Sequence, residues 1–327
     1  MSRLIWADRL KGCLIILVVL GHAIQQVLGA ASEDNHLWNL IYSFHMPAFV
    51  AVSGYLGFRS KRVAVSRRFR QLIVPFLLWS LVLFLVHPPY RLGTLANFVW
   101  RPDSTFWFLW VLFWITWLFW GGDWLAKRLR VKQEVLVGVI CLALVLMMAL
   151  GNVRVLGLQF ISYYFLFYVM GYYLHKYEGL RTSSPALLLL LTAVWAVLAW
   201  FWRMHAAPTF LAGIGLPMSI MNYGYRFLTA FVAVYVILCA APLLLNYRQG
   251  YDNLLLFCGV WSLGIYVLQA FLLPPICSFF GRYLTAIPLI VLGFTLALAG
   301  SLGLVYLLSL NRFTAKYLLG KLDRHIR

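Results

Sequence analysis

An acid, a cation and a histidine share one face of the first apolar stretch, which runs from Asp8 to His22. A helix turns about 100° per residue, so Lys11 and His22 lie within about 20° of one face, and Asp8 lies close to that face. At about 1.5 Å of rise per residue, His22 sits roughly 16 Å above Lys11, about half the hydrocarbon thickness of a bilayer. Ionisable groups in a membrane usually face a cavity, and an imidazole exchanges protons near neutral pH. This face is therefore the first candidate for a functional site.

The elements that must position this face are membrane helices. Of the 327 residues, 63% are hydrophobic and 11% are charged, and no soluble domain of this size can bury that much apolar surface. The pattern predicts an all-α integral membrane protein, a bundle of about ten transmembrane helices that forms a single domain over residues 1–327. The predicted spans are residues 10–30, 37–58, 70–87, 106–120, 134–150, 157–175, 186–204, 219–245, 252–273 and 285–310.

Basic residues predict the orientation of the bundle. With ten spans, 21 of the 27 lysines and arginines fall on one side, which makes that side cytoplasmic and places both termini in the cytoplasm. This topology accounts for the net charge of +18 without nucleic-acid binding, and it leaves room for an anionic substrate. Asp8 and Lys11 then lie at the cytoplasmic mouth of the first helix, and His22 lies toward its outer half.

The second predicted span contains another embedded histidine, His45, at a depth comparable to that of His22. Pro47 follows it closely and is expected to kink the helix, because proline lacks a backbone donor. Two histidines at similar depth indicate a shared polar cavity. In the fourth span, Gly121-Gly122 is expected to mark the end of the helix.

Other polar residues are few. Arg67, Arg68 and Arg70 begin the third span, beside the mouth of the first if sequence neighbours pack together. Gln269 lies in the ninth span, and Asn222, Tyr223 and Arg226 lie near the outer end of the eighth. The five cysteines have no paired spacing, and no histidine cluster has metal-ligand spacing, so neither a disulfide framework nor a metal site is expected.

At these positions the chain resembles the membrane acyltransferase-3 family. Lys11 and His22 match its Arg/Lys-x10-His motif, and the likeness covers most of the chain. Lys11 replaces the more usual arginine, and Gln269 stands where many members have a histidine. The His45-Met46-Pro47 form is closest to the small members called fucose 4-O-acetylase-like. The further matching blocks are Phe44-x-Met46-Pro47, Ser53-Gly54-Tyr55, Arg70 before Pro75, Trp107-Phe108-Leu109 and Ser262-Leu263-Gly264-Ile265-Tyr266.

The resemblance implies a multi-pass enzyme of the bacterial inner (plasma) membrane. It would transfer an acyl group, usually acetyl, from cytoplasmic acyl-CoA to a hydroxyl of a carbohydrate or glycolipid at the outer face. Acyl-CoA, such as acetyl-CoA, would be a co-substrate, and no permanently bound cofactor is implied. Both acetyl and a short diacid such as succinyl fit as the group transferred.

The resemblance also implies roles for individual residues. His22 would be the catalytic base, with Asp8 and His45 as further catalytic residues. Direct transfer and an acyl-histidine intermediate are both compatible with this arrangement. Acyl-CoA phosphates would bind Lys11, Arg67, Arg68 and Arg70, and the acceptor would contact Trp107 and Tyr55.

Plainer interpretations stand beside these roles. His22 and His45 can be buried helix-packing residues, and Asp8 can simply pair with Lys11 three residues on. Arginines near 59–70 also determine topology, and tryptophans also form the interface belt. At the level of the whole chain, the alternatives are a transporter or flippase for a lipid-linked or anionic solute, and a non-catalytic scaffold.

Overall fold

The computed structural model describes residues 4–59, 65–86, 92–102, 106–150, 155–246 and 253–321. Within these ranges the chain forms helices and turns without any strand, which confirms the all-α fold. Among the described residues, eight helical segments are long and apolar enough to cross a membrane, so the chain is a multi-pass membrane protein. Two shorter apolar helices, α8 (Gln133–Leu150) and α10 (Pro185–Trp200), occupy the positions of two further predicted spans. The number of ten spans and the cytoplasmic termini stay predictions.

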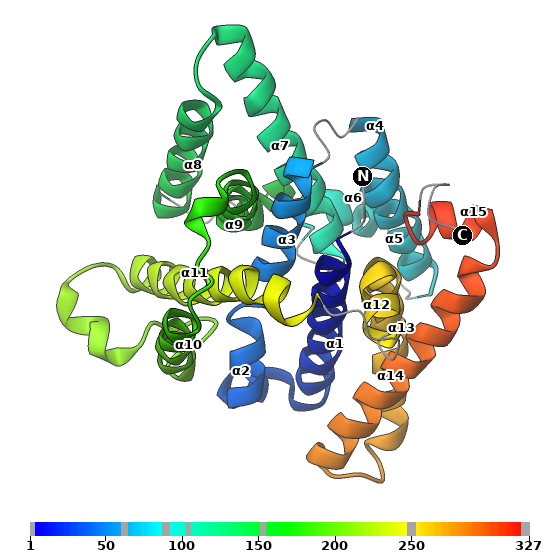
Figure 1. Cartoon of the computed structure of the whole chain (residues 1–327). Helices are drawn as coiled ribbons and strands as arrows, with labels where there is room; N and C mark the ends of the chain where they lie inside the picture. The colour runs from blue at the N-terminus through cyan, green and yellow to red at the C-terminus, as the bar shows by residue number, and fades with distance from the viewer. Residues whose placement is uncertain are drawn as a thin grey trace. The chain divides into compact units, whose positions relative to one another are not determined.

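The chain, which Figure 1 colours by residue number, divides into two compact units that each combine two stretches of sequence. One consists of Met1–Val52 and Tyr177–Val305, and the other of Ser53–Lys176 and Tyr306–Arg327. The helices α3 (His45–Arg59) and α14 (Ala286–Ser309) contribute to both units. The other helices of the first unit are α1 (Ile5–Leu28), α2 (His36–Tyr42), α10, α11 (Met218–Leu244), α12 (Asn253–Val260) and α13 (Ser262–Phe280).

In the first unit, α1 packs against α12, α13, α2 and α11. The contact with α12 is a close backbone approach, visible beside α1 in Figure 1. A Cβ atom on Gly259 would lie 1.6 Å from the carbonyl oxygen of Asp8, and one on Gly12 would lie 2.1 Å from that of Leu255. Small residues permit such an approach because nothing projects between the two backbones. The glycine pair therefore fixes α12 against the Asp8 end of α1.

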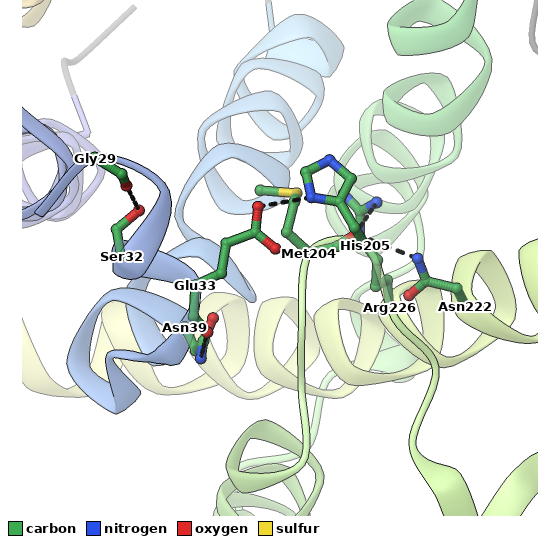
Figure 2. Close-up of polar contacts among 8 residues, drawn as sticks. All are labelled: Gly29, Ser32, Glu33, Asn39, Met204, His205, Asn222 and Arg226. Carbon is green, nitrogen blue, oxygen red and sulfur yellow. Dashed lines mark hydrogen bonds and ion pairs between the residues drawn. The ribbon is translucent and has the colours of Figure 1, made fainter.

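A polar cluster lies at the other end of α1 (Figure 2). The Glu33 carboxylate pairs with Nδ1 of His205 at 2.7 Å, and Asn39 donates to the Glu33 carbonyl at 2.8 Å. Arg226 and Asn222 of α11 both donate to the carbonyl of Met204, at 3.1 and 3.2 Å. The polar residues of the eighth predicted span therefore hold the connection between α10 and α11. The first unit also contains a buried apolar cluster of Ile24, Trp38, Trp202 and Tyr225.

The second predicted span is interrupted where Pro47 predicted a kink. Helix α2 ends at Tyr42 and α3 begins at His45, with a turn at Ser43 and Phe44. Pro47 occupies the first turn of α3, where its missing N–H leaves no intrahelical bond unmade. The proline thus starts a helix rather than bending one.

The second unit is built on three mutually packed helices, α7 (Trp107–Leu129), α8 and α9 (Leu158–Lys176). A Cβ atom on Gly54 of α3 would lie 2.0 Å from the carbonyl oxygen of Tyr168, so α3 and α9 also meet backbone to backbone. Trp79 donates to the carbonyl of Leu318 at 2.9 Å. The remaining helices of this unit are α4 (Val65–Arg68), α5 (Val74–Val86), α6 (Leu92–Trp100) and α15 (Arg312–Tyr317), with a π-helical turn at Phe69–Ile73 between α4 and α5.

Two predicted boundaries are wrong. Helix α7 continues through Gly121-Gly122 to Leu129, because Gly122 serves a helix contact: a Cβ atom there would lie 2.8 Å from the side chain of Ile140 on α8. The predicted span 252–273 is divided at Trp261, and the candidate span is α13, which continues past Pro274 and Pro275 to Phe280.

Candidate functional site

His22 lies on α1 and meets a glutamine from α13. Nε2 of Gln269 lies 2.7 Å from Nδ1 of His22 and 3.1 Å from the carbonyl oxygen of Tyr266. Gln269 is 1% exposed, whereas the His22 side chain is half-buried. The buried Gln269 side chain thus links the backbone of α13 to the imidazole on α1.

The two contacts of Gln269 determine the orientation of its amide. A carbonyl oxygen only accepts, so the Gln269 atom facing the Tyr266 carbonyl must be the NH₂ group. The same nitrogen then donates its second hydrogen to Nδ1 of His22. In the opposite orientation, two acceptor oxygens would face each other. A neutral His22 ring that accepts at Nδ1 carries its proton at Nε2.

His45 begins α3 at the interruption after α2. Its Nδ1–H donates to the carbonyl of Ile41 at 2.7 Å, because a carbonyl oxygen only accepts. The ring is 2% exposed and lies edge-on to Tyr42, with 4.7 Å between ring centroids. A neutral ring that donates at Nδ1 has its lone pair at Nε2. The two histidines therefore have opposite tautomers.

Helix packing brings the two imidazoles into the same region of the first unit. A Cβ atom on Gly21 would lie 2.9 Å from the ring of Tyr42, and the Tyr42 hydroxyl donates to Gln25 at 2.7 Å. Tyr42 therefore lies between α1 and the His45 ring. The His22 and His45 rings are also within range of direct charge interaction. The sequence predicted that these two histidines share a polar cavity, and that shared cavity stays a prediction.

Asp8 and Lys11 lie at the opposite end of α1. Their side chains form an ion pair of 2.6 Å, as their spacing of three residues suggested. The helix is continuous from Ile5 to Leu28, so Asp8 lies about 21 Å along the axis from His22. That distance keeps Asp8 out of contact with His22, and its ion pair holds Lys11. The neighbouring Arg9 donates to the carbonyl of Leu245 at 2.8 Å.

The three arginines of the second unit have different environments. Arg67 and Arg70 are exposed, and Nε of Arg70 donates to the carbonyl of Ser66 at 3.3 Å. Arg68 is half-buried, its Nε is buried without a hydrogen-bond partner among the described residues, and its charge interacts with buried Tyr168. The π-helical turn at Phe69–Ile73 follows it directly, a feature that is frequent at functional sites. Of these three arginines, Arg68 is therefore the strongest candidate to bind an anion.

The two residues proposed to contact an acceptor are packed within the second unit. Tyr55 is 4% exposed and its ring stacks on that of His175, with 4.1 Å between centroids. The backbone carbonyl of Tyr55 accepts a hydrogen bond from Nδ1 of His175 at 2.6 Å. Trp107 stacks on Phe160 and Tyr164 of α9, with centroid distances of 4.6 and 5.3 Å. Both rings thus have aromatic neighbours of their own.

Gln269 is the residue to which the sequence assigned no role. It was visible as an amide in an apolar helix, but its partner lies 247 positions away and only the packing of α13 on α1 reveals it.

Among the residues that the structure describes, no group of three histidine, cysteine or acidic side chains could hold a metal ion. The candidate site contains two imidazoles, each held by a hydrogen bond to a different residue. Imidazoles held in this way are suited to proton transfer and to hydrogen-bond donation.

Comparison with known proteins gives two kinds of match. A family model described as an acyltransferase domain matches residues 4–310. The nodulation protein NolL of Sinorhizobium fredii is 32% identical over 213 residues, which cover 60% of this chain and 56% of that protein. NolL of Mesorhizobium japonicum is 33% identical over 120 residues, 32% of each chain. The chain therefore matches about half, or less, of the length of these relatives. No solved structure matches it.

Proposed function

The chain belongs to the acyltransferase-3 family, and from this premise we propose that it transfers an acyl group, usually acetyl, from cytoplasmic acyl-CoA to a hydroxyl of a carbohydrate or glycolipid at the outer face of the membrane. The observation that carries the proposal is that the first unit holds two imidazoles, each fixed by its own hydrogen bond: His22 to Gln269 and His45 to the Ile41 carbonyl. Acyl transfer to a hydroxyl requires a group that accepts the hydroxyl proton, and imidazole is the usual one. The acceptor belongs to the carbohydrate class because the family resemblance implies it.

The position of His22 on α1 supports a donor that reaches in from the cytoplasm. Lys11 lies roughly 16 Å along the helix from His22 and is held by Asp8. Acyl-CoA carries phosphates at one end and the thioester at the end of a long pantetheine arm. A cation at the mouth of the helix and an imidazole about half a bilayer deeper suit these two ends.

Arg68 is the strongest candidate for a phosphate contact in the second unit. Its guanidinium is half-buried, and its Nε has no hydrogen-bond partner among the described residues. A buried polar group without a partner is costly, and a phosphate oxygen would supply the missing acceptor. Arg67 and Arg70, being exposed, are expected to contribute longer-range attraction.

Replacing Arg68 tests this assignment. A hydrogen bond to a charged group is worth about 1.5–3 kcal/mol, so Arg68→Gln should raise the Kd for acetyl-CoA by about tenfold or more. Arg70→Gln should have a smaller effect because Arg70 is exposed. Binding is measured by titrating the purified protein with acetyl-CoA in a calorimeter, with Arg312→Gln as the control at an exposed cation. Equal affinity of Arg68→Gln and wild type would contradict the assignment.

Turnover of radiolabelled acyl-CoA by the purified protein tests the activity itself. In detergent, wild type should release label from acetyl-CoA or transfer it to a sugar hydroxyl, and His22→Ala should do so far more slowly. Acetyl-CoA and succinyl-CoA tested in parallel identify the acyl group. If no acyl-CoA were bound or turned over by a monodisperse protein, the reading as a transporter or flippase would replace this one.

A further inference from the structure

The two histidines of the site present different atoms to a substrate. His22 accepts from Gln269 at Nδ1, so its Nε2 carries a hydrogen. His45 donates from Nδ1 to Ile41, so its Nε2 carries a lone pair. One ring is thus prepared to donate a hydrogen bond and the other to accept a proton.

Backbone carbonyls fix both tautomers. The Tyr266 carbonyl orients the Gln269 amide, which in turn fixes His22, and the Ile41 carbonyl fixes His45 directly. Gln269 and His45 are 1% and 2% exposed, so water does not compete for these hydrogen bonds. Reversing either tautomer would leave a donor facing a donor or an acceptor facing an acceptor.

We propose that the two imidazoles divide the chemistry: His45 is the base that takes the acceptor's proton, His22 donates a hydrogen bond to the thioester carbonyl oxygen, and Gln269 is the positioning residue that holds His22 in this role. This inference rests on the proposed acyl transfer. It assigns to His45 the base function that the motif spacing suggested for His22.

The proposed step is balanced without any further reactant. The acceptor oxygen attacks the thioester carbonyl carbon while its proton passes to Nε2 of His45. Nε2–H of His22 stabilises the negative charge that builds on the carbonyl oxygen. As the carbon–sulfur bond breaks, protonated His45 returns the proton to the leaving CoA sulfur. The products are the ester and the free thiol, and both rings regain their starting state.

A neutral imidazole suits the role proposed for His22. A neutral ring keeps its Nε2 proton and therefore acts by donating a hydrogen bond to the carbonyl oxygen. A neutral histidine polarises the substrate carbonyl in the same way in triosephosphate isomerase. The half-buried His22 ring is the more accessible of the two. The proposal requires the reacting carbon to lie within reach of Nε2 of both rings.

Substitutions that keep or remove the N–H group separate the two roles. Glutamine can place an amide N–H near the position of Nε2, so His22→Gln should retain at least about tenfold more turnover than His22→Ala, which loses the donor. At His45 a glutamine cannot accept a proton, so His45→Gln should be as impaired as His45→Ala, about 10²–10⁴-fold. The reverse pattern, with rescue at position 45 and none at position 22, would overturn the proposal.

Nitrogen NMR of protein labelled with ¹⁵N-histidine reads the tautomers without any activity measurement. His22 should show an unprotonated Nδ1 and a protonated Nε2, and His45 the opposite. Gln269→Glu replaces the amide donor with an acceptor, so it should move the His22 proton to Nδ1 and lower kcat about 10²-fold with little change in KM for acetyl-CoA. A wild-type His22 protonated at Nδ1 would overturn the proposal. Because this readout needs no turnover, failure of the tautomer assignment is distinguishable from failure of the acyltransferase function.

Discussion

Replacing His22 with alanine is expected to lower kcat for acyl transfer about 10²–10³-fold, the usual cost of removing one hydrogen-bond donor from a developing oxyanion. The KM for acetyl-CoA should change little, because donor binding is assigned to Lys11 and Arg68 and not to His22. Steady-state kinetics with purified protein measure both quantities. A rise in KM of about 10²–10³-fold with unchanged kcat would assign His22 to substrate binding and contradict the account.

A histidine outside the site provides the matched control. His205 is 75% exposed and pairs with Glu33, and an exposed ion pair contributes at most about 1 kcal/mol. His205→Ala should therefore keep wild-type turnover within about twofold. The double variant His22→Ala/His45→Ala should be no more than about tenfold slower than the slower single variant, because residues that act in one step are not additive. Full multiplicative loss would indicate that the two rings act independently.

Replacing Gly259 with alanine is expected to destabilise the first unit by about 3 kcal/mol, the upper end of the usual cost of overpacking. The new Cβ atom would lie 1.6 Å from the carbonyl oxygen of Asp8 and 2.9 Å from the amide nitrogen of Gly12, both backbone atoms of α1. Neither atom can move without separating α12 from α1. Thermal unfolding in detergent should show a much lower Tm, or the variant should fail to purify as a single species.

The control for this substitution is another helical glycine. A Cβ atom on Gly303 of α14 would meet no atom within 4 Å, so Gly303→Ala should leave the Tm unchanged or raise it slightly, because alanine favours helix by about 1 kcal/mol. A Gly259→Ala variant as stable as Gly303→Ala would mean that the α1–α12 contact is looser than the structure has it.

The periodicity of the first helix was sufficient to predict part of the site. Lys11 and His22 fall on one face whatever the partners of α1 are, because that relation depends only on helical geometry. His45 was predicted for a similar reason: an ionisable residue in an apolar span has few uses other than function or helix packing. The local cause of its orientation, the Ile41 carbonyl at the end of α2, also follows from nearby sequence.

The rest of the site depends on contacts that local sequence does not encode. Gln269 and His22 meet because α13 packs on α1, and a single sequence carries no sign of that pairing. Arg68 is more buried than Arg67 and Arg70, and no local pattern in the sequence separates the three arginines. The pair Gly121-Gly122 was wrongly predicted to end a helix, because a glycine that ends a helix and one that allows helices to touch look the same in sequence.

The central claim, that a His22-dependent reaction draws acyl-CoA from the cytoplasmic side, is tested most directly with membrane vesicles of known sidedness. Radiolabelled acetyl-CoA, which does not cross the membrane, is added outside to inverted and to right-side-out vesicles that contain wild type or His22→Ala. The account predicts label turnover by wild type in inverted vesicles, none in intact right-side-out vesicles until detergent is added, and about 10²–10³-fold slower turnover by His22→Ala in inverted vesicles. Equal turnover by intact right-side-out vesicles, or turnover by His22→Ala at the wild-type rate, would contradict it.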